Sequence, residues 1–219
     1  MLVAESKSAK TSSLGEQRVV FDRISWVGYE QLLGILGESR STRLTYDRGL
    51  LEITMPSQAH ENSNELIGVF IRMLVFELGM NIKSMGSTTL NRPDLLKGAE
   101  PDNCYYIQNE PVVRGRTIDL DRDPPPDLVV EVDITHTDIN KLSLYAAIGV
   151  PEFWRYDGEI LRLYQLQANG VSGGEYLELD TSPTFPQISK EMFYQFLDQC
   201  RIEGESQAMR NFRGTLASR

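Results

Sequence analysis

The stretch PPPDLVVEVDITHTDINKLSLYAAIGVPEFW, residues 124–154, decides how the rest of the chain is interpreted. Its centre, DLVVEVDI, predicts a β-strand, introduced by three prolines that cannot themselves pair inside a sheet. Because side chains alternate along a strand, one face carries three acids, Asp127, Glu131 and Asp133, while the other is entirely aliphatic. Such a face is either exposed to solvent or lines a site, and the strand alone leaves both interpretations open.

The segment after this strand, THTDINKLSLYAAIG, predicts a helix. Thr137 is the expected N-cap, Asp138 favours the positive end of the helix dipole, and Gly149 is the expected stop. Lys141 then lies in the first turn, where its ammonium could reach the end of the strand. The alternative is a solvated surface lysine, since such lysines are common.

The rest of the chain predicts one α/β domain of the mixed α+β kind, with a mixed central sheet flanked by helices and extra N-terminal and C-terminal hairpins. We expect this domain over residues 18–200, after a flexible leader (1–17) and before a C-terminal tail (201–219). The expected elements are helices at about 26–37, 59–78 and 189–200, hairpins turning at 47–49 and 157–158, and extended segments at about 81–90, 102–108 and 175–188.

Composition narrows the class of protein. The 219 residues are 41% hydrophobic and 24% charged, which is typical of globular proteins, and no apolar run suits a membrane-spanning helix or a signal peptide. We therefore expect a cytoplasmic protein with no membrane partner. The formal net charge of −9 repels polyanions, so binding to nucleic acid would require local arginine patches, divalent metal, or both.

A second acidic segment, EPD at 100–102, begins the extended segment that precedes the acidic strand. Two neighbouring strands could thus each bring a carboxylate to one point. Carboxylates held close together repel unless a cation lies between them, and hard oxygen ligands suit Mg²⁺ or Mn²⁺. This pattern favours the interpretation of the acidic face as a site.

The segments EPD, PPDLVVEVDIT and NKLSLYAAIGVPEFWRYD, in this order, resemble the restriction-endonuclease-like superfamily and its PD-(D/E)xK motif. More narrowly, the chain resembles the Uma-type endonuclease family, from about Arg43 to the C-terminal helix. The resemblance implies a restriction-endonuclease-like core and Mg²⁺ (or Mn²⁺) bound by Asp102 and Glu131 as catalytic acids. His60 or Glu61, at the start of the first long helix, would supply a further polar group.

The chain departs from the motif at its third position, where Asp133 stands two residues after Glu131 in place of the lysine. Lys141, from the following helix, is the expected substitute, and Asp133 remains a candidate site residue. The resemblance implies an endonuclease acting on DNA, for which a symmetric homodimer would most easily cut both strands. The alternative is a catalytically weak or inactive nuclease-fold domain that serves in binding or assembly, which the acidic net charge and the missing motif lysine favour.

Overall fold

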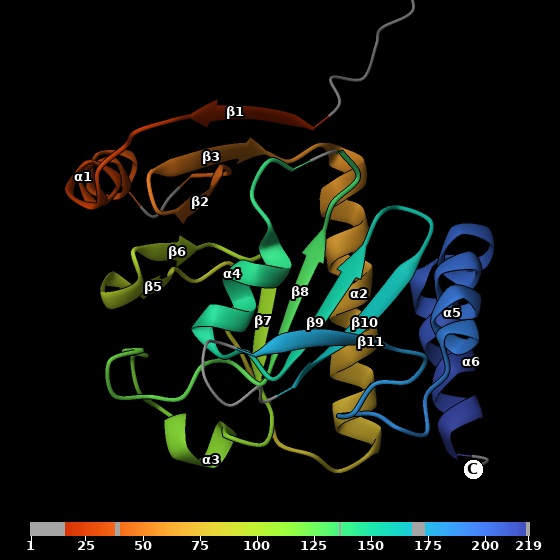
Figure 1. Ribbon diagram of the computed structural model, residues 1–219. Coiled ribbons are helices and arrows are strands. Elements are labelled where there is room, and N and C mark those ends of the chain that lie inside the picture. Colours follow the sequence, from red (N-terminus) through yellow and green to blue (C-terminus); the bar gives the residue numbers. More distant parts are fainter. Residues whose placement is uncertain (1–15, 38–39, 136, 168–173, 218–219) are drawn as a thin grey trace, which may run out of the picture.

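The computed structural model describes residues 16–37, 40–135, 137–167 and 174–217. Of the predicted leader, only Glu16 and Gln17 fall within this part of the chain. Two sheets and the helices packed on them make up the described structure (Figure 1). In chain order the elements are β1 (Gln17–Phe21), α1 (Trp26–Leu36), β2 (Arg43–Asp47), β3 (Leu50–Met55), α2 (Gln58–Glu77), β4 (Lys83–Ser84), β5 (Leu90–Arg92), η1 (Pro93–Leu95), β6 (Lys97–Ala99), β7 (Asn103–Tyr106), α3 (Glu110–Val113), β8 (Leu128–Val132), α4 (Lys141–Ile148), β9 (Glu152–Tyr156), β10 (Leu161–Gln167), β11 (Glu175–Leu179), α5 (Lys190–Glu203) and α6 (Glu205–Ala217).

The larger sheet has the strand order β11-β10-β9-β8-β7-β4. β8 and β9 pair in parallel, because α4 carries the chain back between them, and the other pairs are antiparallel. Helices α2, α5 and α6 cover one face of this sheet and α4 covers the other (Figure 1). The mixed pairing and the helices on both faces confirm the predicted fold class.

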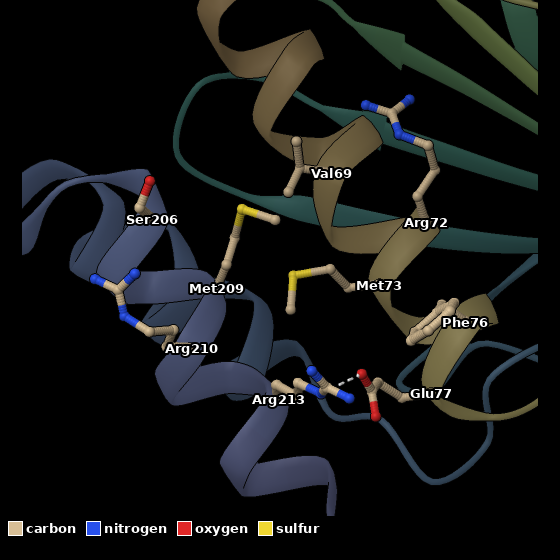
Figure 2. A pocket seen from close by; sticks show the side chains of 9 residues that line it. All are labelled: Val69, Arg72, Met73, Phe76, Glu77, Ser206, Met209, Arg210 and Arg213. Carbon is tan, nitrogen blue, oxygen red and sulfur yellow. Dashed lines mark ion pairs between the residues drawn. The ribbon is translucent and has the colours of Figure 1, made fainter.

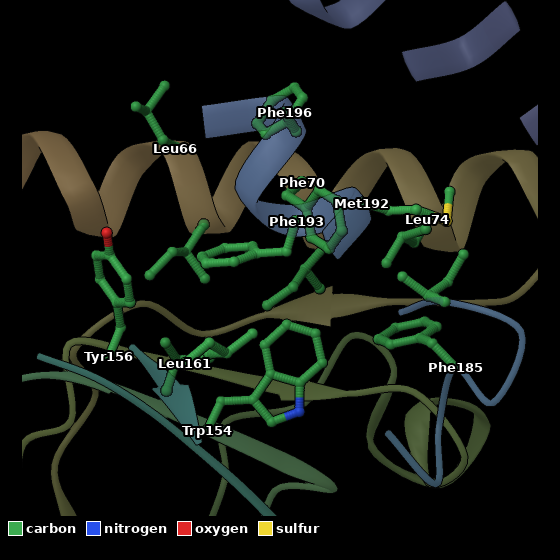
Figure 3. Packing of buried hydrophobic residues seen from close by; sticks show 14 of the residues in the cluster. Leu66, Phe70, Leu74, Trp154, Tyr156, Leu161, Phe185, Met192, Phe193 and Phe196 are labelled. Carbon is green, nitrogen blue, oxygen red and sulfur yellow. The ribbon is translucent and has the colours of Figure 1, made fainter. Parts of the chain in front are cut away.

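The aliphatic face of β8 packs into the main hydrophobic core beneath α2. Val130 and Val132 belong to this core together with Trp154 of β9. Trp154 lies below Phe70 of α2 and Phe193 of α5 in Figure 3. Phe70 meets Phe193 edge to face, with ring centroids 5.4 Å apart. This core fixes β8 as a central strand.

The acidic face of β8 is buried as well, under α4. Asp127, Glu131 and Asp133 are only 3–4% exposed, and Val129 of the same face packs with Tyr145 of α4. The interpretation of this face as a solvated surface is therefore wrong. Buried carboxylates need partners, so each of them must be accounted for individually.

The smaller sheet, β1-β3-β2-β6-β5, lies beside the first and contains the predicted N-terminal hairpin. The hairpin turns at Arg48 and Gly49, both in left-handed backbone conformation. Helix α1 packs on it through Tyr29, whose ring stacks on Tyr46 at a centroid distance of 4.9 Å. This sheet brings charged side chains of β1, β2 and β3 close to the end of β8.

The core extends past residue 200, the end expected for the domain. Residues 205–217, within the expected tail, form α6, which turns back at Gly204 and buries Ala208 and Phe212 against α2 and α5. Beside this contact, an open groove of about 550 Å³ lies between α6 and α2. An ion pair of 2.9 Å between Arg213 and Glu77 lies at its edge (Figure 2). Helix α6 is thus part of the packed structure.

We expect Phe212→Leu to lower the free energy of unfolding by about 1 kcal/mol, because a smaller side chain fills the site less completely. The ring of Phe212 stacks on Phe70 at 4.8 Å and also contacts Phe196. Urea unfolding measures the change, with the exposed neighbour Thr215→Ala as control. Equal stability of wild type and Phe212→Leu would mean that the Phe212 ring makes no specific packing contribution to the core.

Candidate functional site

A small cavity of about 10 Å³ lies where β8, β7, α2 and α4 meet the smaller sheet. A space of this size admits about one water-sized oxygen atom. The residues that line it share a polar or charged side chain: Arg18, Arg43, Thr45, Thr54, His60, Glu100, Asp102, Glu131 and Lys141. Four of the five predicted site residues, His60, Asp102, Glu131 and Lys141, therefore line one cavity.

Lys141 points into this cavity from the first turn of α4 and is 7% exposed. Its Nζ donates to Glu131 Oε2 at 2.7 Å and to Asp133 Oδ1 at 2.8 Å. The solvated alternative for this lysine is therefore wrong. The predicted N-cap Thr137 is also wrong, because the side chain of Asn140 caps the helix, which begins three residues later than Asp138. The predicted stop at Gly149 is confirmed.

Asp102, just before β7, is held against the neighbouring strand. Its Oδ2 accepts the backbone N–H of Val132 at 2.8 Å and lies 3.1 Å from His60 Nε2. Burial alone would raise the pKa of Asp102, but the hydrogen bond and charge of His60, together with the charge of Lys141, hold it below its usual value. Asp102 is thus a carboxylate at neutral pH.

Glu131 has a donor on each oxygen: Tyr145 Oη on Oε1 and Lys141 Nζ on Oε2. Burial raises the pKa of Glu131 to about 7; the charge of Lys141 opposes this, while those of Asp102 and Asp133 add to it. A buried carboxyl that titrates near neutrality and lines a cavity is typical of functional sites.

Asp133 does not line the cavity and instead lies behind it, among three cations. It accepts from Lys141 at 2.8 Å, from Arg18 at 3.0 Å and from Arg155 at 3.0 Å. Burial opposes ionisation, but the charge and hydrogen bond of Lys141, with the charges of Arg155 and Arg18, lower the pKa of Asp133 to about 2. Asp133 therefore anchors the cations and holds Lys141 in place.

The smaller sheet also contributes residues that were not expected at this site from the sequence. Arg18 of β1 binds Glu52 of β3 at 2.7 Å, and Glu52 also accepts from the backbone N–H of Asp138 at 3.0 Å. Arg43 of β2 lines the cavity beside Asp102. One signal was available: Arg18 and Glu52 are charged residues within the apolar extended segments RVVF and LLEITM.

Two other acids considered from the sequence, Asp127 and Glu61, do not line the cavity. Both oxygens of Asp127 are used in the loop after β7, by the backbone N–H groups of Ile107 and Asn109 and by the Asn109 side chain. The Glu61 side chain is 44% exposed and does not line the cavity, which leaves His60 as the residue that α2 contributes.

A family model described as "Putative restriction endonuclease", Uma2, matches residues 26–198. The chain belongs to the Uma2 family. Membership confirms the predicted family and the restriction-endonuclease-like fold class, and it assigns the chain in general terms to a nuclease family. A comparison with curated proteins finds no match. Within the described residues, no helix has the length and apolarity that crossing a bilayer demands.

Families with the restriction-endonuclease-like fold generally use divalent metals, and such an ion requires oxygen donors at the site. No group of three or more His, Cys, Asp or Glu side chains in the described part of the chain is arranged to hold an ion. Mg²⁺, however, is commonly bound by one or two carboxylates, with water and phosphate oxygens completing its shell. Asp102 and Glu131, both lining the cavity, are donors of this kind, so the residues fit such an ion.

Proposed function

We propose that this Uma2-family protein is a divalent-metal-dependent endonuclease that hydrolyses phosphodiester bonds in DNA. The observation that carries the proposal is the position of Lys141, whose ammonium contacts Glu131 at 2.7 Å and lines the same cavity as Asp102. Asp102, Glu131 and Lys141 thus line one cavity and are all buried, so each electrostatic interaction among them is stronger than in water.

In this proposal Asp102 and Glu131 would hold Mg²⁺ or Mn²⁺, which supplies Lewis acidity to the phosphate and to a bound water. The charges of Asp133, Glu131 and Asp102 outweigh burial and raise the pKa of Lys141 above its usual value. Lys141 therefore keeps its proton and stabilises negative charge that develops on the phosphate. Attack of water at phosphorus breaks one P–O ester bond and leaves a phosphate end and a hydroxyl end.

We expect Asp102→Ala and Glu131→Ala to lose nicking of supercoiled plasmid by at least about 100-fold, because each would remove one of the two carboxylates proposed to bind the ion. The assay compares Mg²⁺, Mn²⁺ and EDTA, on both plasmid and single-stranded DNA. Glu65→Ala is the matched control, since Glu65 is an exposed acid of α2 that does not line the cavity. Equal nicking by wild type and all variants, or no nicking with any metal, would refute the proposal that the protein is a nuclease.

The alternative, a weak or inactive domain for binding or assembly, draws support from two observations. The chain has a formal net charge of −9, and both oxygens of Glu131 are already hydrogen-bonded. Metal binding that is lost in Asp102→Ala, without cleavage by wild type, would favour this alternative.

We further propose that the protein is a cytoplasmic homodimer, since a symmetric dimer could cut both strands of a duplex. Light scattering during size-exclusion chromatography measures its mass and tests the dimer.

A further inference from the structure

Arg43, at the start of β2, has a hydrogen-bond donor that it does not use. Its side chain is 15% exposed, and its Nε atom is buried without a hydrogen-bond partner in the described structure. Nε forms an ion pair with Asp102 Oδ1 at 3.8 Å, a distance that is too long for a hydrogen bond. A buried donor left unpaired is costly, so such groups call for an explanation.

The other two cations of the cavity are fully engaged. Lys141 donates to Glu131 and Asp133, and Arg18 donates to Glu52 and Asp133, at distances of 2.7–3.0 Å. Arg43 has only weak contacts by comparison: its terminal nitrogens lie 3.3 Å from the Ser41 carbonyl and 3.4 Å from Glu61. Arg43 is therefore the cavity cation whose charge is least satisfied by the protein.

His60, which lines the same cavity, has a second buried nitrogen, Nδ1, with no hydrogen-bond partner among the residues that the structure describes. Two orphan nitrogens around a space for about one oxygen atom indicate an occupant that the protein does not supply. Three acids and three cations line this space, so the unused N–H of Arg43, and not an excess of positive charge, is what calls for an acceptor oxygen. Arginine is well suited to it, because its planar guanidinium binds phosphate oxygens through several N–H groups.

We propose that Arg43 is a substrate-binding residue that donates through Nε to a non-bridging oxygen of the phosphate at which cleavage occurs. This inference rests on the proposed function for the source of the phosphate, but the recognition itself requires only a phosphate group. The phosphate oxygen would lie in the space for about one oxygen atom that this cavity offers. The role differs from that of Asp102 and Glu131, because Arg43 holds the anion rather than the metal.

The test uses inorganic phosphate as the probe, with EDTA present, and the full chain as wild type, Arg43→Met, Arg43→Lys and Arg48→Met. Arg48 is the matched control, because it lies in the turn of the same hairpin and does not line the cavity. Calorimetry gives the dissociation constant, and thermal unfolding without phosphate shows whether each variant is folded. We expect Arg43→Met to weaken binding by about tenfold or more, Arg43→Lys to recover it only in part, and Arg48→Met to match wild type.

Phosphate binding that is absent in wild type, or unchanged in Arg43→Met, would overturn the inference. The nicking assay separates this result from failure of the proposed function. Arg43-dependent phosphate binding without cleavage by wild type would refute the nuclease and keep the anion site. Cleavage that depends on Asp102, together with normal phosphate binding by Arg43→Met, would support the nuclease proposal and refute the anion site at Arg43.

Discussion

Replacing Lys141 by methionine should lower the free energy of unfolding by about 3–5 kcal/mol and abolish DNA cleavage. Methionine has a similar length but no charge, so Glu131 and Asp133 would lose the ammonium that both contact in a buried site. Breaking a buried ion pair by removing one partner is costly, because it leaves the other partner's charge uncompensated. Cleavage should fail because the cation proposed to stabilise the reacting phosphate would be gone.

The loss of stability in Lys141→Met should depend on pH in a defined direction. The native pKa of Glu131 is already raised by burial to about 7, and removing Lys141 would raise it further. A carboxyl whose native pKa exceeds its unfolded value binds more protons when folded, so stability falls as pH rises. The variant should therefore lie closer to wild type at pH 5 than at pH 8.

Urea unfolding across this pH range measures the effect, with Lys190→Met as control, since Lys190 at the start of α5 is outside the site. Lys141→Arg keeps the charge and should retain more stability than Lys141→Met. Wild-type stability in Lys141→Met at pH 8 would contradict the role that the contacts assign to this lysine.

Local sequence patterns predicted the central part of the fold because its signals are short in range. The alternation in DLVVEVDI, the glycine stop at Gly149 and the turn at Asp157–Gly158 each specify a few consecutive residues. Burial of the acidic face was not predictable in this way, because it results from α4 folding back over β8. Helix α6 was missed for a similar reason: only contacts with α2 and α5 show that Phe212 is a core residue.

The candidate site shows the same difference between residues related by local spacing and residues brought together by long-range contacts. Asp102, Glu131 and Lys141 were found because family spacing relates them within one segment of the chain. Arg18 reaches Asp133 from 115 residues away, and no local pattern predicts such a contact. That contact also explains the departure from the motif, because a lysine at position 133 would face Arg18 and Arg155, whereas an aspartate binds both. The aspartate at 133 and the lysine at 141 thus belong to one network of ion pairs.

Replacing Asp133 by asparagine should lower the free energy of unfolding by about 2 kcal/mol at pH 7. The native pKa of Asp133 is about 2, below the ordinary aspartate value of 3.8. Burial opposes this shift, but Lys141, Arg155 and Arg18 stabilise the charge of the carboxylate. A carboxyl with a depressed native pKa contributes stability above its unfolded pKa, at about 1.4 kcal/mol per pKa unit, and loses it as pH falls through the native pKa. The difference between wild type and Asp133→Asn should therefore be constant from pH 7 to about pH 5 and shrink below about pH 4.

The same substitution should reduce cleavage by about tenfold rather than abolish it, because Asp133 positions Lys141 without lining the cavity, and Lys141 keeps its bond to Glu131. Urea unfolding from pH 7 to pH 3 gives the stability difference, with Asp198→Asn as control. Asp198 is 66% exposed in its ion pair with Arg201, so its loss should change stability by less than about 1 kcal/mol. An Asp133→Asn penalty that stays the same at pH 3 would indicate that packing, and not the charge held among three cations, sets the contribution of Asp133.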